Sequence, residues 1–171
     1  MKNSGKPLNQ NRLQELALRY VSRYATTRHK LASYLGRKVQ ERGWDDETAA
    51  DYEVLVERFA ELGYIDDALF AKSKAASLTR RGYGARRVSQ ALYQSGIEEA
   101  DGQEAINLTN QQKWQAAETF ARKRSIGPFA PEQQEREICQ KQLAAFIRAG
   151  HSYDVASRFV FAMPGDVIDD C

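Results

Sequence analysis

Apolar residues recur along this chain with the spacing of helical faces. Between Leu13 and Tyr24 they fall three and four residues apart, which puts them on one side of a helix. The same spacing returns in the later segments, Tyr34 included, and predicts about nine helices in all. No segment alternates β-branched and polar residues, and no hairpin turn lies between such segments. The pattern therefore predicts an all-α fold.

The pattern is clearest over residues 52–97. An amphipathic helix ends at Gly63, a residue type that helices often have just after their last turn. Asp66 and Asp67 begin the next helix, where carboxylates accept hydrogen bonds from free amides and favour the positive end of the helix dipole. A third helix follows the turn at residues 82–84. This stretch is expected to hold one complete three-helix unit and the end of the unit before it.

Parts of the sequence resemble each other. Residues 91–97 (ALYQSGI) align with residues 145–151 (AFIRAGH), and Phe70-Ala71 aligns with Phe120-Ala121. A repeat of roughly 45–55 residues predicts tandem three-helix units, each packed mainly on its neighbours, in an elongated, curved array. The expected organisation is a disordered arm over residues 1–10, three-helix repeats over residues 11–64, 65–110 and 111–163, and an acidic tail over residues 164–171.

Charge is distributed in blocks along the chain. The net charge is only +2, but residues 1–44 carry 10 basic and 2 acidic side chains, residues 45–70 carry 1 and 9, and residues 71–97 carry 6 and 0. With 42% hydrophobic residues and a mean hydropathy of -0.63, the chain suits thin helical layers better than one large core. Such segregation allows one basic face on a nearly neutral molecule.

Cysteine content and apolar runs bear on where the protein works. Cys139 and Cys171 are too few for a disulfide framework and favour a reducing compartment. The first ten residues have no apolar core, so they do not resemble a signal peptide. No apolar run reaches the roughly 20 residues that a membrane span needs. We therefore expect a cytoplasmic protein without a membrane anchor.

The sequence offers few residues for catalysis. His29 and His151 each lack a metal-ligand partner at suitable spacing, and both are interpreted as ordinary surface or boundary residues. Asp66 and Asp67 are adjacent, so they point in different directions and fit helix caps better than a metal pair. The glycine turn begins like a dinucleotide loop, but Arg87 stands where the third glycine belongs and no strand precedes it. We expect no catalytic residue, no metal and no cofactor.

Basic clusters are the stronger functional signal. A run of charge is usually only a solvated surface, but here the clusters recur on equivalent helices, which favours a binding stripe for a polyanion or an acidic protein surface. Each lysine or arginine that neutralises a phosphate releases counterions. The candidate binding residues are Arg28, Lys30, Arg37, Lys38, Arg80, Arg81, Arg86, Arg87, Arg122, Lys123 and Arg124.

A second interpretation is a helix-turn-helix. Residues 68–94 form two helices joined by a short turn, and residues 85–94 would then be the recognition helix. Gln90 and Gln94 could contact base edges. Specific recognition usually needs a dimer or an arm as well, and the sequence indicates neither.

A family resemblance adds to this interpretation. Residues 59–71 read FAELGYIDDALFA and are followed by Arg81-Gly82 and by a leucine helix that ends in Gly96-Ile97. This pattern resembles the RecX family of regulators of the RecA recombinase, and the similarity extends over residues 13–160. The third unit matches more loosely: His151 stands where the family often has an aromatic residue, and an insert surrounds Gly127.

The resemblance implies a non-enzymatic modulator built of three-helix repeats. Such proteins bind along RecA filaments on DNA and inhibit RecA ATPase, strand exchange and co-protease activity, and so modulate DNA repair, recombination and the SOS response. The expected partners are the RecA filament and, more weakly, single- and double-stranded DNA, with the regulator acting as a monomer. The family supplies no catalytic residue, and the basic surface above is placed from the charge distribution alone.

Overall fold

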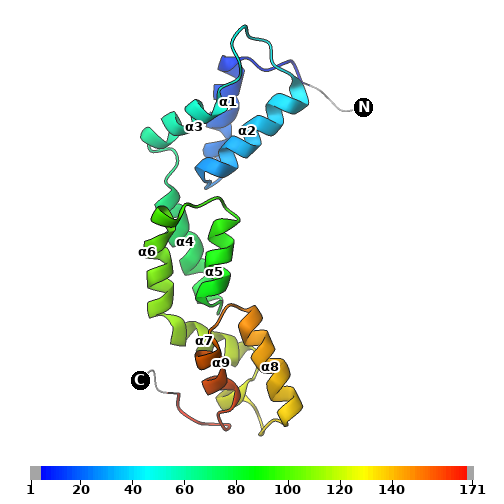
Figure 1. Ribbon diagram of the computed structural model, residues 1–171, viewed down its shortest axis with the longest axis vertical. Coiled ribbons are helices and arrows are strands. Elements are labelled where there is room, and N and C mark those ends of the chain that lie inside the picture. The colour runs from blue at the N-terminus through cyan, green and yellow to red at the C-terminus, as the bar shows by residue number, and fades with distance from the viewer. Residues whose placement is uncertain (1–4, 169–171) are drawn as a thin grey trace. The chain divides into compact units, whose positions relative to one another are not determined.

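The computed structural model describes residues 5–168, and every regular element in that range is a helix (Figure 1). The one β pairing recorded there is an isolated bridge between Leu8 and Trp44. The all-α prediction is therefore confirmed. The elements are α1 (Gln10–Val21), α2 (Arg28–Arg42), α3 (Tyr52–Glu61), α4 (Asp67–Arg80), α5 (Ala85–Tyr93), α6 (Glu99–Gln111), α7 (Lys113–Lys123), the short 3-10 helix η1 (Gly127–Phe129), α8 (Arg136–Arg148) and α9 (Tyr153–Val160).

The chain divides into two compact units. Unit 1 holds the residues up to 70 together with residues 95–97, and unit 2 holds residues 71–94 and those from 98 onward. Unit 1 thus contains α1 to α3, the first residues of α4 and the short segment that follows α5. This division passes through α4, so the boundaries of the three repeats stay a prediction.

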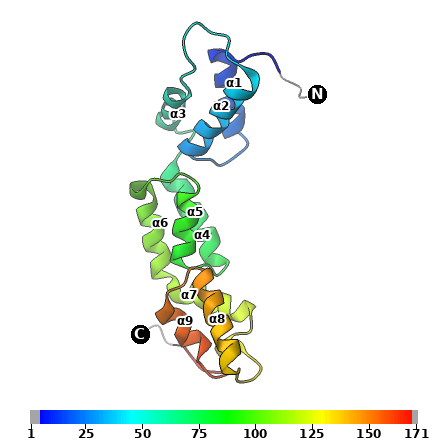
Figure 2. The same cartoon turned by 45° about the vertical axis from the view of Figure 1, so that its right-hand side comes forward.

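The core of unit 1 comes from the apolar faces that the sequence pattern predicts. Helices α1, α2 and α3, drawn from blue to cyan in Figure 2, turn these faces toward one another. Removing each large aliphatic side chain from water stabilises the fold by about 1.5–3 kcal/mol. The buried cluster consists of Leu8, Leu13, Ala17, Leu31, Leu35, Leu55, Val56, Phe59 and Ile65.

Leu8 departs from the disordered arm expected over residues 1–10. Its side chain is fully buried in the unit 1 cluster. Its amide donates to the carbonyl of Gly43 at 2.9 Å, and its own carbonyl accepts from the amide of Asp45 at 2.8 Å. A single leucine in a polar stretch has no periodicity, so the sequence pattern could not identify this anchor. Residues 1–4 of the expected arm lie outside the described residues.

Aromatic rings dominate the core of unit 2. The rings of Phe120 and Phe146 lie 4.6 Å apart, and Phe146 stacks on Phe159 at 6.0 Å. Cys139 is also buried in this cluster as a free thiol, whereas Cys171 lies outside the described residues. The remaining buried members are Ala117, Ala121, Ile126, Ala149, Val155, Ala156 and Val160.

Polar residues fix where the helices begin and end. The hydroxyl of Thr27 accepts from the amide of Lys30 at 3.2 Å and caps α2. Asp66 Oδ1 accepts from the amide of Leu69 at 2.8 Å and so caps α4 in the predicted way. Gly63 follows α3 with a φ of 78°, a conformation that glycine adopts without steric cost.

One polar stretch is helical. Residues 109–112 read TNQQ, a composition typical of a linker, but α6 continues to Gln111 and α7 begins at Lys113. Thr109 is buried, and its hydroxyl donates to the carbonyl of Ala105 one turn earlier at 2.9 Å. A threonine satisfied in this way can remain inside a helix, so its polarity does not interrupt α6.

Candidate functional site

The predicted basic residues fall into two groups, one in each unit. Four lie on α2 in unit 1, and seven lie in unit 2 at the end of α4, the start of α5 and the end of α7. The α2 group is Arg28, Lys30, Arg37 and Lys38, and the unit 2 group is Arg80, Arg81, Arg86, Arg87, Arg122, Lys123 and Arg124. The two groups differ in how many of their cations pair with a carboxylate.

Arg28 is largely committed to the fold of unit 1. Its guanidinium lies 3.5 Å from Asp67 Oδ2 and 3.4 Å from Glu57 Oε2. Its backbone amide donates to Asp67 Oδ1 at 3.0 Å. Asp67 is only 3% exposed, and a carboxylate buried to that degree needs a paired charge and hydrogen bonds. The expectation that Asp67 serves mainly as a helix cap is therefore incomplete, since it also binds Arg28.

The other α2 cations also have neighbours within unit 1. Lys38 Nζ lies 2.6 Å from Glu41, and the Arg37 guanidinium lies 3.8 Å from the same carboxylate. Lys30 Nζ lies 4.6 Å from the centre of the Phe70 ring, within the range of a cation–π contact. These contacts are near the surface, where ion pairs contribute little, so Arg37 and Lys38 can still meet a partner.

In unit 2 the folding of the α4–α5 turn gathers the basic residues. Gly82 has a φ of 91°, and a Cβ there would lie 2.9 Å from the backbone nitrogen of Phe120. The turn can therefore lie directly on α7. Lys123 Nζ donates to the carbonyl of Arg81 at 3.2 Å, which ties the end of α7 to the end of α4. The Arg81 guanidinium lies 5.2 Å from the centre of the Tyr83 ring.

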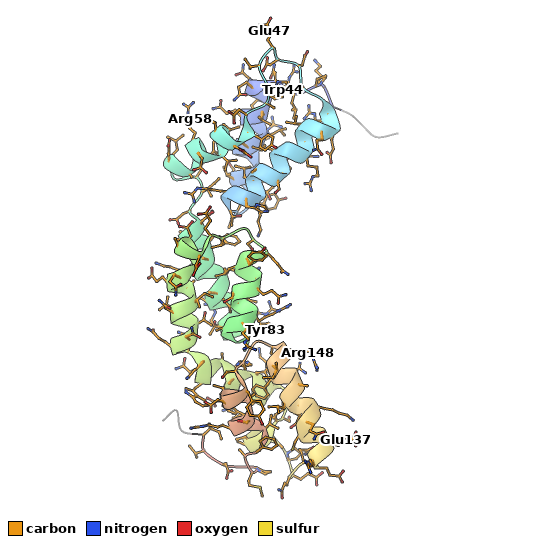
Figure 3. All side chains as sticks on the ribbon, in the orientation of Figure 1. Trp44, Glu47, Arg58, Tyr83, Glu137 and Arg148 are labelled. Carbon is orange, nitrogen blue, oxygen red and sulfur yellow. The ribbon has the colours of Figure 1, made fainter. Side chains whose placement is uncertain are left out.

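The same turn is fixed on its other side by the α8–α9 turn. The amide of Gly84 donates to the carbonyl of Ala149 at 2.9 Å, and the amide of Arg86 donates to the carbonyl of Gly150 at 3.2 Å. A Cβ on Gly84 would collide with the backbone of Gly150. Figure 3 labels Tyr83 on the first turn and Arg148 just before the second. We call this contact, residues 81–87 with residues 148–151, the glycine joint.

His151 belongs to the glycine joint, and its interpretation as a surface or boundary residue is wrong. It is 2% exposed, and its Nε2 lies 2.9 Å from the carbonyl oxygen of Gly82, so Nε2 carries the proton and donates. The rings of Phe120 and Phe146 lie 5.6 Å and 5.3 Å from it. Burial lowers the pKa of His151, and the hydrogen bond to Gly82 opposes that change only in part.

The cations around the glycine joint are exposed and mostly lack a carboxylate partner. Arg122 pairs with Glu118 at 2.6 Å. Within residues 5–168, no carboxylate lies within 4 Å of the other six side chains of this group. Their charges are therefore available to an external partner, unlike that of Arg28.

Sequence reasoning missed a second group of residues in unit 1. Tyr20, Tyr24 and Tyr34 were assigned to apolar faces, but α1 ends at Val21, and Tyr24 lies beyond it with 57% of its surface exposed. The rings of Tyr20 and Tyr34 stack at 4.4 Å. The sequence did contain a signal for this group, because each of these tyrosines has an arginine within three residues of it along the chain.

Two kinds of site are missing from the part of the chain that the structure describes. No group of three or more histidine, cysteine, aspartate or glutamate side chains could hold a metal ion there. No described helix is both long enough and apolar enough to cross a membrane.

Known proteins similar to this chain point to one family. A family model described as RecX, second three-helix domain, matches residues 66–106. The regulatory protein RecX of Myxococcus xanthus (strain DK1622) is 33% identical over 163 residues, which is 89% of this chain and 86% of the relative. The regulatory protein RecX of Agrobacterium fabrum is 28% identical over 158 residues, 90% of this chain and 84% of the relative.

Solved structures agree at the level of the fold. The crystal structure of RecX from Lactobacillus salivarius has a TM-score of 0.63 and 19% identity, covering 86% of this chain and 91% of its own. A second structure, of regulatory protein RecX, has a TM-score of 0.64 and 23% identity, covering 88% and 72%. Together with the identity to the Myxococcus xanthus relative over nearly the whole length, these findings place the chain in the RecX family of regulatory proteins.

Proposed function

We propose that this protein binds RecA filaments on DNA in the cytoplasm and inhibits RecA ATPase, strand exchange and co-protease activity. It would thereby modulate DNA repair, homologous recombination and the SOS response, acting by binding rather than by catalysis. Membership of a family of regulatory proteins supports this proposal. The structural observation that carries it is the set of exposed cations, without carboxylate partners among the described residues, around the glycine joint.

The cations of the glycine joint suit a filament that carries DNA. They come from three helices whose ends the α4–α5 turn brings together, since Gly82 lies against α7 and Gly84 against the α8–α9 turn, so the cluster is already assembled before binding. Phosphates and acidic protein surfaces both attract such a cluster, and each neutralised phosphate adds a salt-dependent contribution to affinity. Binding through this surface is therefore expected to weaken as salt rises.

The test is ATP hydrolysis by RecA on single-stranded DNA with this protein titrated in. We expect turnover to fall as the protein approaches RecA in concentration, and co-sedimentation with RecA filaments to require a nucleotide that supports filament formation. Unchanged turnover at stoichiometric protein would contradict the proposal. A parallel titration without RecA measures binding to DNA alone.

The alternative is a helix-turn-helix module that binds DNA without a recombinase. In such modules the first residues of the second helix contact base edges. Here the backbone at the start of α5 is bound to the α8–α9 turn, since the amides of Gly84 and Arg86 donate to the carbonyls of Ala149 and Gly150, while the side chains of Arg86 and Arg87 stay exposed. Gln90 and Gln94 remain exposed, but they lie at the far end of the helix. The position of these two glutamines disfavours the alternative, which also predicts tight DNA binding without RecA.

A further inference from the structure

An open groove on unit 1 combines aromatic rings and cations. Its walls come from α1, α2 and the connection between them, and its lining contains no acidic residue. The lining residues are Leu16, Arg19, Tyr20, Arg23, Tyr24, Tyr34 and Arg37. We call this feature the tyrosine groove. Only Arg37 among its residues belongs to the candidate surface predicted from the sequence.

The three tyrosines form a cluster in which Tyr20 stacks on Tyr34 and the tilted ring of Tyr24 is exposed to solvent. Tyr20 lies between the other two, with its ring 4.4 Å from that of Tyr34 at 23° and 5.3 Å from that of Tyr24 at 52°. Tyr20 and Tyr34 also pack against the unit 1 core. Tyr24 is not part of that core and is the ring available to a ligand.

Core packing explains two of the tyrosines but not the third. Tyr24 follows the end of α1, and its amide donates to the carbonyl of Tyr20 at 3.0 Å, which holds the backbone beside the stack. An exposed aromatic ring held next to Tyr20 gains little stability from its position, because much of its surface stays in water. The same arrangement presents a flat face to which another planar group can stack.

The arginines of the groove are weakly engaged. Arg19 and Arg37 lie 3.9 Å and 3.8 Å from single carboxylates, and both side chains are more than 60% exposed. Exposed pairs of this kind contribute about 0–1 kcal/mol. Arg23 has no carboxylate within 4 Å among the described residues. Three cations thus surround the exposed ring and can turn toward an anionic ligand.

We propose that the tyrosine groove binds a single-stranded nucleic acid, with an unpaired base stacked on Tyr24 and its phosphates contacting Arg19, Arg23 and Arg37. Rings that accept any base, beside cations that follow a backbone, are the usual basis of such binding. A duplex does not offer a free base face, so a single strand is preferred. The inference rests on the proposed function only in naming DNA as a partner, and it adds the site and the kind of strand.

The test is fluorescence anisotropy of a labelled oligothymidine of about 16 nucleotides with the full-length protein and no RecA. We expect Tyr24→Ala to weaken binding about 5- to 100-fold, because one base–ring stack is lost. Tyr24→Phe keeps the ring and should bind like the wild type. Tyr93→Ala is the matched control, since Tyr93 lies on α5, outside the groove, and is 83% exposed.

The salt dependence of oligothymidine binding distinguishes arginines that contact phosphates in the groove from cations elsewhere on the surface. Arg23→Ala should reduce the slope of log affinity against log salt by about 0.7, the value for one phosphate contact on a single strand. Arg58→Ala removes the same charge from α3, outside the groove, and should leave the slope unchanged. Far-ultraviolet circular dichroism of each variant checks that the helices are intact.

Two outcomes would overturn the tyrosine groove. Equal affinity of Tyr24→Ala and Tyr93→Ala for oligothymidine means that the ring is not used. Displacement of oligothymidine by polyglutamate, with Tyr24→Ala binding both equally, means that the arginines bind an acidic peptide instead. Neither outcome bears on the filament proposal, which is judged by RecA turnover, and unchanged turnover would not bear on binding measured without RecA.

Discussion

His151 is a buried side chain that links the α8–α9 turn to the α4–α5 turn through one hydrogen bond. Its Nε2–H donates to the carbonyl of Gly82, a backbone acceptor in the turn between α4 and α5. Sequence reasoning interpreted it as a surface or boundary residue because no ligand or carboxylate lay at a meaningful spacing. The partner is 69 residues away along the chain, so only tertiary structure identifies it.

The burial of His151 predicts a pH dependence of stability. The unfolded chain titrates this histidine near pH 6.5, and burial lowers its pKa in the folded protein. Between the two values the unfolded state binds more protons. The free energy of unfolding should therefore fall as the pH drops below about 6.5, with the loss complete once the pH is below the folded pKa.

Urea unfolding at about pH 7.5 and about pH 5.5 measures this effect, with two variants for comparison. His151→Phe removes the titrating group together with the hydrogen bond to Gly82, so it should flatten the pH dependence and lose about 1 kcal/mol at neutral pH. His151→Gln retains a donor and should flatten the dependence with a smaller loss. If the wild type and His151→Phe lose the same stability on acidification, His151 is not the cause.

The same kind of contact between helices occurs in both units: a turn that contains a glycine lies against the start of another helix. In unit 1 the Thr27 hydroxyl donates to the carbonyl of Ser95 at 2.6 Å, and Gly96 lies against His29 at the start of α2. In unit 2, Gly150 lies against the start of α5, as described above. The sequence alignment of residues 91–97 with residues 145–151 therefore corresponds to equivalent positions in space.

The helices and their apolar faces could be predicted because both follow from local spacing. Gly63 and Asp66 act where the sequence pattern predicts, since capping involves only neighbouring residues. The sequence could not predict which cations pair with carboxylates inside the fold and which remain free for a partner. Arg28 and Arg80 look alike in the sequence, but only Arg28 has a buried carboxylate beside it, and that carboxylate comes from another helix.

Gly84→Ala tests the glycine joint as a structural element. The new Cβ would collide with the backbone of Gly150, so the turns must separate and the hydrogen bond to Ala149 must lengthen. We expect a loss of about 1–3 kcal/mol. Gly43→Ala is the control: its φ of 81° strains alanine, but nothing lies within 4 Å of the new methyl group. Its loss should be about 1 kcal/mol.

Thermal or urea unfolding of both variants gives the comparison. The loss for Gly43→Ala reports the strain of a positive φ without any contact, whereas Gly84 has an ordinary φ of -83° and its loss reports the close approach to Gly150. A loss for Gly84→Ala well below about 1 kcal/mol would mean that the turns are not in tight contact. Because the glycine joint positions the cations, Gly84→Ala should also weaken inhibition of RecA in proportion to its effect on that contact.

For the molecule as a whole, charge serves two purposes. Much of the acid of residues 45–70 is used inside unit 1: Asp66 caps α4, and Glu57 and Asp67 pair with Arg28. The basic residues 80–87 have no such use within the described chain. A net charge near zero therefore conceals a paired region around Arg28 and Asp67 and an unpaired cationic region at the glycine joint, and we expect the second to contact the filament.

Combined replacement of four cations at the glycine joint separates function from stability. The variant is Arg80→Ala, Arg81→Ala, Arg86→Ala and Arg87→Ala in one chain. Each side chain is exposed, so each change should alter stability by no more than about 0.5 kcal/mol. The hydrogen bond from the Arg86 amide to Gly150 is retained, because it involves only the backbone. If each cation contributes about 0.5 kcal/mol to filament binding, the affinity falls about 30-fold.

The measurement is the concentration that half-inhibits RecA ATPase, with melting followed in parallel. A charge-matched control replaces four other unit 2 cations, namely Lys72, Lys74, Arg136 and Lys141. Leu92→Ala gives the converse: Leu92 is buried, so about 2–5 kcal/mol of stability is lost while the cations remain. If the variant without Arg80, Arg81, Arg86 and Arg87 and the charge-matched control lose inhibition equally, then net charge alone explains the loss. If only the four-arginine variant loses inhibition, and its melting temperature is unchanged, then filament binding is assigned to the surface that the two glycine turns hold in place.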